Sequence, residues 1–450
     1  MMLFLLIKKE MLEQIMTLRF AISCIVCLVA IFSSIIVQTR GYRNSLLDYQ
    51  ADVLMHKNEI LEYEDPHDLL KGGIYVDKPL NPMTIFFKGM DRGSRTTVRI
   101  ASERELEFQG GDHERALAVL PFPAMDLIFF TSLIMSLLAI VFSYDSISGE
   151  NESGTLRIML SYSLPRDIVL LGKWIGGYIM VITPFLISIL GGLIVVLTFP
   201  DVYLASSNWL ELGVVMVSSL LYLSAVYSLG IFLSARTKKA STSISVLLSI
   251  WVMAILVIPN ISPDIASQIR PLSIQSLEGE KREIWEDEMR KHREKDREYH
   301  QNLSHEEAHR RLRTALEKTK MEITAQQEKV SDDFKRELHA QVALAKHISR
   351  ISPLSSFVYS AVEMLGMGMD EREHFMKAVV RYRDRWVEYA EDKHDAGVEE
   401  FPDYPRFVYE GIPPGDRLRK IFIDVLVLGI WNIGFFMAAY LSFLRYDLTS

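Results

Sequence analysis

The residues of this sequence that come nearest to an enzymatic motif are His305, Glu306 and His309, in the stretch HEEAH. They match H-E-x-x-H, in which two histidines one helical turn apart hold zinc and the glutamate acts as a general base. A working site also needs a third ligand and a dry cavity, and neither is visible in the charged flanks. We interpret the motif as the solvated first turns of a helix, with incidental metal binding as the alternative, and predict no resident metal.

A nucleotide-binding loop is not found in the sequence either. Gly172-Lys173 lacks the upstream glycine and the following Ser or Thr of the phosphate-cradling pattern. We therefore expect no catalytic residues and no cofactor in this chain. Any ATP and Mg²⁺ would belong to a separate subunit.

The most specific pattern lies in residues 143–177, SYDSISGENESGTLRIMLSYSLPRDIVLLGKWIGG, between two long apolar segments. An acidic pair is followed by Gly-Thr-Leu, an apolar turn, Pro-Arg and Gly-Lys. The matching residues are Glu150, Glu152, Gly154, Thr155, Leu156, Pro165, Arg166, Gly172 and Lys173. Together they resemble the first cytoplasmic loop of ABC-2-type permeases, the membrane subunits of one class of ABC exporters.

The resemblance implies that this loop folds as a short coupling helix and docks into a groove on an ABC ATPase. The candidate coupling residues are Glu150, Glu152, Gly154, Thr155, Leu156, Arg157, Pro165, Arg166 and Lys173. Glycines 149 and 154 can break the preceding helix, and acidic residues suit the start of a new one. Leu156, Ile158, Met159 and Leu160 provide an apolar side. A plain interfacial helix between two spans is the alternative.

Composition divides this chain into apolar and charged segments. It has 450 residues, 49% of them hydrophobic yet 24% charged, with a net charge of −8 and no basic domain that would suggest nucleic acid. The only cysteines, Cys24 and Cys27, lie in an apolar run and are interpreted as small apolar residues.

The apolar runs predict an all-α polytopic membrane protein with six transmembrane helices, since about twenty helical residues cross roughly 30 Å of hydrocarbon. The expected order is interfacial elbow helix 1–17, span 18–37, first outer domain 38–122, span 123–143, coupling loop 144–173, span 174–199, span 209–234, basic loop 235–241, span 242–259, second outer domain 260–420, span 421–444 and tail 445–450. A signal peptide competes for the N-terminal segment, but the run from 18 to 37 lacks a cleavage site and favours a retained anchor.

Short loops set the expected orientation. Arg236, Lys238 and Lys239 lie in one of them, whereas residues 200–208 contain no Lys or Arg. The positive-inside rule then places the basic loop, the coupling loop and both termini in the cytoplasm of an inner-membrane protein. Few charges occur within the spans, namely Arg19, Asp126, Glu211 and Asp424, and we expect them to reach polar headgroups, with no buried charge pair.

The two long outer segments are expected to differ in fold. In the first, a helix over 42–64 is followed by a small α/β lobe with strands at TIFFK (84–88) and TTVRIA (96–101). In the second, a capping box at Ser304-x-x-Glu307 and a helical apolar stripe predict a long charged hairpin or stalk. Two amphipathic helices follow, at 351–366 and 369–391. The phrase VDKPLNPMTIFFKG (76–89) and these two helices resemble parts of an ABC-2-type subfamily with an enlarged extracytoplasmic part, whereas the charged stalk departs from small members of the class.

We therefore expect a permease subunit of an ABC exporter. It would form a homodimer, or a heterodimer with a sister permease, and bind two ATPase subunits and membrane lipid. A rival function is mechanical, with ATPase motion transmitted to an extracytoplasmic partner and nothing crossing the membrane. A membrane anchor without any ATPase is a third possibility.

Overall fold

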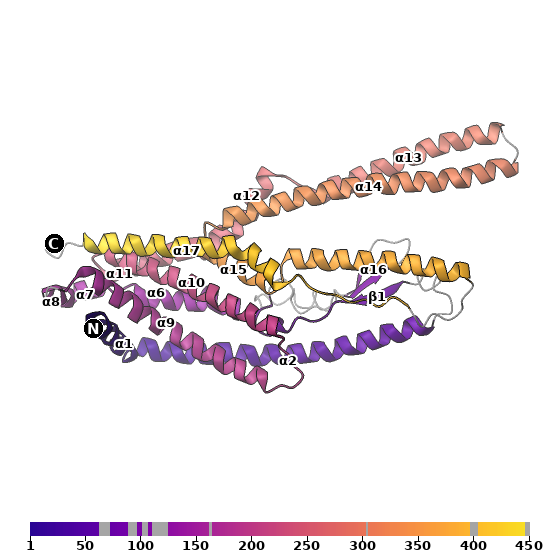
Figure 1. The fold of residues 1–450 in the computed structure, drawn as a ribbon. Coiled ribbons are helices and arrows are strands. Elements are labelled where there is room, and N and C mark those ends of the chain that lie inside the picture. Colours follow the sequence, from indigo (N-terminus) through magenta and orange to yellow (C-terminus); the bar gives the residue numbers. More distant parts are fainter. Residues whose placement is uncertain are drawn as a thin grey trace. The chain divides into compact units, whose positions relative to one another are not determined.

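A computed structural model describes residues 1–62, 73–88, 97–100, 107–109, 125–161, 164–302, 305–396 and 404–445. The chain divides into two compact units (Figure 1): one comprises residues Met1–Ile255 and Pro353–Ser450, and the other comprises Leu256–Ser352.

The first unit begins with two helices, α1 (Met2–Ile15) and α2 (Leu18–Glu62). Helix α1 lies within residues 1–17, where an interfacial elbow helix was predicted. The helix predicted over 42–64 continues the first span without a break, because α2 runs for 45 residues. At 1.5 Å per residue such a helix is about 68 Å long, more than twice the thickness of a bilayer core.

Among the described residues, six helical segments are long and apolar enough to cross a membrane. The first is α2, and the second consists of α5 (Leu127–Phe129), the π-helical η2 (Phe130–Met135) and α6 (Ser136–Ser143). The third and fourth are α9 (Arg166–Leu197) and α10 (Ser206–Arg236). The fifth contains α11 (Ala240–Val252) and the π-helical η3 (Met253–Val257), and the sixth is α17 (Pro414–Leu444). This confirms the expected all-α polytopic fold. The third of these segments starts at Arg166, eight residues before the expected boundary at 174, so Lys173 lies inside α9 and not in the loop.

An antiparallel sheet forms part of the first outer segment, in the order β1 (Ile74–Asp77), β2 (Thr97–Ile100) and β3 (Glu107–Gln109). Residues 97–100 of the predicted TTVRIA strand are confirmed as β2. The strand predicted at TIFFK is wrong, because residues Pro82–Ile85 form the 3₁₀-helix η1. Asn81 caps this turn by accepting a hydrogen bond from the Met83 backbone N–H at 2.9 Å, and Pro82 suits a helical first turn.

Helices α15 (Pro353–Met364) and α16 (Met369–Ala396) confirm the two amphipathic helices expected there. Helix α15 packs against α10 and α17, whereas α16 shares a second hydrophobic core with β1, β2 and the end of α2. Trp386 is fully buried in this second core, beside the buried strand residues Ile74 and Val98. This lobe, which we call the outer lobe after its predicted location, therefore joins segments from both stretches that were predicted to lie outside, 38–122 and 260–420.

The second unit holds α12 (Ile258–Ile269), α13 (Ile274–Asn302) and α14 (His305–Ser349). Helices α13 and α14 run side by side (Figure 1), and Gln327 of α14 donates to the Lys281 backbone carbonyl of α13 at 2.9 Å. Closer to the C-terminal end of α14, Gln341 donates to the Arg270 carbonyl at 2.6 Å. The predicted antiparallel hairpin is confirmed. Ser304 lies outside the described residues.

Candidate coupling site and a buried ion-pair hub

The loop between the second and third spans folds into two short helices, α7 (Ser148–Glu152) and α8 (Thr155–Ser161). Gly154 separates them with a φ of +76°, a conformation that glycine adopts without strain. Gly149 lies inside α7, so only Gly154 breaks the helix as expected. Glu150 is in the first turn of α7, as predicted, whereas Glu152 ends that helix. Pro165 is the residue before α9 begins.

A buried ion-pair cluster fixes α7 to the neighbouring helices. The Lys173 ammonium of α9 lies 2.6 Å from Glu150 Oε1 of α7 and 3.4 Å from Glu10 Oε2 of α1. Lys173 is only 4% exposed, so two carboxylates compensate its charge where water cannot. Burial raises the pKa of Glu10, and the Lys173 charge opposes that rise. Carboxylate oxygens of Glu10, Glu13 and Glu150 lie close together, but the lysine already serves as the cation of this cluster.

Close contact between α1 and α9 supports the same cluster. A Cβ atom added at Gly172 would lie 2.9 Å from Leu6 Cβ, and one added at Gly176 would lie 2.9 Å from Glu10 Cβ. Real side chains almost never approach so closely, so these glycines let the two helices pack at short range. Helix α7 is thus tied through Glu150 to a closely packed pair of helices, α1 and α9.

Fewer apolar residues of α8 are exposed than the sequence suggested. Leu156 is fully buried within the chain, so it is not available to enter a partner's groove in this conformation. Ile158 is 61% exposed, and Thr155, Arg157 and Ser161 are also exposed. The surface that a partner can reach is therefore an isoleucine flanked by an arginine and two hydroxyl groups.

Several elements meet at this end of the first unit (Figure 1). The Ser234 hydroxyl, near the end of α10, accepts from the backbone N–H groups of Ile147 and Ser148 at 3.0 Å each. Arg166 donates to the Leu444 carbonyl at the end of α17, at 2.6 Å. The exposed Arg236 ends α10, and the exposed Lys238 and Lys239 follow directly after it. The loop, the basic turn and the α1 and α17 ends of the chain therefore share one end of the unit, as the expected topology requires.

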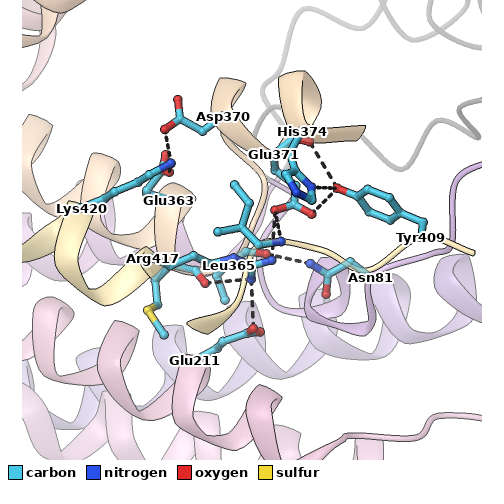
Figure 2. Close-up of polar contacts among 12 residues, drawn as sticks. Asn81, Glu211, Glu363, Leu365, Asp370, Glu371, His374, Tyr409, Arg417 and Lys420 are labelled. Atoms are coloured by element: carbon cyan, nitrogen blue, oxygen red, sulfur yellow. Dashed lines mark hydrogen bonds and ion pairs between the residues drawn. The ribbon is translucent and has the colours of Figure 1, made fainter. Parts of the chain in front are cut away.

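A second buried cluster surrounds Arg417, in the first turns of α17 (Figure 2). Its Nη1 lies 3.0 Å from Glu211 Oε1 of α10, and its Nη2 lies 3.1 Å from Glu371 Oε2 of α16. All three side chains are less than a tenth exposed. Nη1 also donates to the Met364 carbonyl at the end of α15, at 3.3 Å. We call Arg417, Glu211 and Glu371 the Arg417 hub.

Backbone and side chains enclose the Arg417 hub. Gly366 has a φ of +66°, and a Cβ there would lie 2.6 Å from Arg417 Nη2. Its N–H and that of Met367 bond to carbonyls in the last turn of α15, at 3.1 and 3.0 Å, which is the glycine-terminated helix end that positive φ permits. Glu371 accepts in addition from the Tyr409 hydroxyl at 2.7 Å and the Ile412 N–H at 3.3 Å. Two spans, two helices and one extended segment thus meet on one guanidinium.

Further contacts surround the hub in Figure 2. The Asn81 side chain, which also caps η1, donates to the Leu365 carbonyl at 2.7 Å and so ties the first outer segment to this place. Lys420 pairs with Asp370 and with Glu363, in positions more exposed than the hub itself.

The sequence-based expectation of no buried charge pair in the spans is wrong. Glu211 forms a buried pair with Arg417. Arg19 also pairs with Asp145, at 2.7 Å, and contacts Tyr144, but these contacts are exposed. Asp126 caps α5 by accepting from the Phe129 N–H. The sequence feature that could have predicted the Glu211–Arg417 pair is that these residues carry opposite charges near the ends of two long apolar helices.

The remaining sequence motifs carry less chemistry in the structure. His305 is the first residue of α14, so the HEEAH motif lies in the first turns of a charged helix, and the structure describes no side chains there. Cys27 Sγ contacts Met135 Sδ at 3.4 Å in the buried core, which agrees with its interpretation as a small core residue.

Taken together, the six long apolar helices and the short helices at one end define a multi-pass α-helical membrane protein. The family model described as ABC-2 family transporter protein matches residues 4–448, so the chain belongs to the ABC-2 transporter family. It is similar to the probable ABC transporter permease protein NosY of Stutzerimonas stutzeri, with 30% identity over 139 residues, 31% of this chain. The protein of the same name in Pseudomonas aeruginosa is 30% identical over 136 residues. The chain spans about half the length of these curated relatives.

Proposed function

We propose that this protein is the membrane permease subunit of an ABC exporter, and that helices α7 and α8 transmit the motion of a separate ATPase subunit. The observation that carries the proposal is the anchoring of α7 through Glu150 and Lys173 to α9 and α1, with Ile158 and Arg157 turned outward on α8. A docked ATPase that pushes on α8 would move α9 and α1 with it, since a buried ion pair resists separation.

This coupling function has a direct binding test. Ile158→Asp places a charge where an apolar contact is expected, and an unpaired buried carboxylate costs several kcal/mol, roughly enough to lower affinity a thousandfold. Co-purification of the ATPase from native membranes should therefore fail. Met321→Asp changes another exposed apolar residue, 74% exposed on α14; it is the control and should leave co-purification unchanged. Undiminished recovery with Ile158→Asp would remove α8 from the interface.

Transmission of force to an outer partner is the second candidate function, and two contacts favour it. Helix α2 continues from the first span to the outer lobe, where the His56 ring lies 2.7 Å from an Asp77 carboxylate oxygen of β1. The Arg417 hub joins α10 and α17 to α16 of the same lobe. Movements of three spans would therefore reach the outer lobe through rigid connections.

Export and mechanical transmission differ in what happens to a solute. In reconstituted vesicles, export predicts ATP-dependent movement of a co-purified small molecule across the bilayer. Transmission predicts an ATP-dependent change in the distance between the α16 helices of two copies of the permease, measured by spin labels, without such movement. A distance that is unchanged by ATP, together with solute movement, would eliminate the mechanical candidate.

A further inference from the structure

Helix α12 carries an apolar face that is not covered by the described residues of its own compact unit. Ile261, Ile265 and Ile269 are 45%, 38% and 60% exposed, and their spacing of four residues places them along one side of the helix. The buried positions of α12 are Ser262 and Ala266, and the helix packs along α14. The three isoleucines, which we call the isoleucine face, thus remain exposed after α12 has packed in its own unit.

The position of α12 in the chain indicates which surface lies next to its isoleucine face. It follows α11 and η3 without a break, and all three lie in the candidate membrane-spanning segment that begins at Ala240. About twenty helical residues cross the hydrocarbon of a bilayer, so α12 begins at the depth where a span starting at Ala240 ends. Its only charged residue is Asp264, and Asn260, Ser267 and Gln268 are polar. An apolar face, a polar face and little charge are typical of a helix that lies in a membrane interface.

We propose that the isoleucine face of α12 lies in the lipid of the membrane surface from which α11 emerges, and so anchors the base of the α13–α14 hairpin to the bilayer. Lipid is favoured over a second copy of the chain on grounds of area. Three isoleucine side chains offer a few hundred Å², well below the ~1,600 Å² of a stable protein interface. Lipid, in contrast, lies next to α12 because of its covalent link to a span.

The functional consequence concerns the hairpin. Arg270, directly after α12, pairs with Glu337 at 3.4 Å, and its carbonyl accepts from Gln341 of α14. An α12 held in the membrane surface would therefore hold one end of α14 at a fixed depth. The anchoring of α12 depends on the membrane-spanning fold and not on the coupling proposed for α8. Either proposal can therefore be refuted while the other stands.

Fluorescence quenching tests the lipid contact. In a Cys24→Ser/Cys27→Ser background, Ile265→Cys and the polar-face control Ser267→Cys each receive an environment-sensitive dye, in phosphatidylcholine nanodiscs. We expect a nitroxide on the lipid headgroup to quench position 265 about twofold or more over position 267, and aqueous iodide to do the reverse. If Ile265→Cys does not yield monodisperse protein, Ile269→Cys on the same face replaces it.

Two results would overturn the proposal. Equal iodide quenching at both positions would show that the isoleucine face lies in water. Self-quenching between labelled copies in one nanodisc, abolished by dilution with unlabelled protein, would show that a second copy covers it instead of lipid.

Discussion

Replacing Arg417 with alanine is expected to destabilise the first unit severely. The substitution leaves Glu211 and Glu371 buried without their cation, and breaking a buried pair in this way costs ~3–5 kcal/mol. A second estimate agrees: taking up a proton at pH 7 on one carboxyl of ordinary pKa costs about 3–4 kcal/mol, at 1.36 kcal/mol per pH unit. The expected loss is thus several times that of an average substitution, which is about 1 kcal/mol.

The assay is the apparent unfolding midpoint in detergent at one scan rate, followed by intrinsic fluorescence, because unfolding of large proteins is often irreversible. Arg419→Ala is the matched control. Arg419 is 87% exposed, lies two residues away on α17 and reaches Asp416 only at 4.0 Å, so its loss should cost less than about 1 kcal/mol. Arg417→Met combined with Glu211→Gln and Glu371→Gln should recover most of the stability, since a neutral cluster needs no cation.

The pH dependence of the stability deficit of Arg417→Ala is a further check. Protonating a carboxyl becomes cheaper as the pH falls, so the deficit of Arg417→Ala should shrink between pH 7 and pH 5. If Arg417→Ala unfolds at the same midpoint as Arg419→Ala, the hub contributes nothing and the reasoning about its buried charges is refuted.

Three other outcomes follow from the structure. Gly366→Ala should destabilise by ~1–3 kcal/mol, since it combines a positive φ with a close contact to Arg417, whereas Gly415→Ala, where a Cβ meets nothing, should not; equal midpoints would contradict this. Because burial raises the pKa of Glu10 above its ordinary value of 4.5, its contribution to stability is full below pH 4.5 and is lost as the pH rises through the raised pKa. Glu10→Gln should therefore flatten that part of the stability–pH curve, and an unchanged curve would contradict the assignment. Replacing residues 281–346 by a short Gly/Ser linker should leave the unfolding midpoint of the first unit nearly unchanged, because the hairpin belongs to a separate compact unit; loss of monodisperse protein would contradict this independence.

The sequence predicted the elements whose signal is local. Six apolar helices, the α13–α14 hairpin and strand β2 each follow from periodicity or composition over a short window, and the structure confirms them. The strand expected at TIFFK was wrong because Asn81-Pro82, just before it, starts a helical turn whose cap outweighs the β propensity of two phenylalanines.

The candidate sites depended on contacts between distant residues, which one sequence does not reveal. The pairing of Lys173 with Glu10 spans 163 positions, and that of Arg417 with Glu211 spans 206. The family pattern in the loop singled out Glu150, Leu156 and Lys173 as a set. Leu156 and Lys173 are buried and Glu150 pairs with Lys173, so these contacts hold the loop against its own chain. The residues that face outward, Arg157 and Ile158, follow from which side of α8 packs inward, and that is a property of the tertiary fold.

The docking of a separate ATPase on α8 is the central claim, and site-specific photo-crosslinking tests it most directly. A photoreactive amino acid at Ile158 is compared in intact cells with one at Tyr203, which is 81% exposed in the turn between α9 and α10. The coupling proposal predicts that position 158 captures a polypeptide with a nucleotide-binding Gly-x-x-x-x-Gly-Lys-Ser/Thr loop, and that position 203 does not. Capture of that polypeptide at position 203, or at neither position while ATP-dependent output persists, would contradict it.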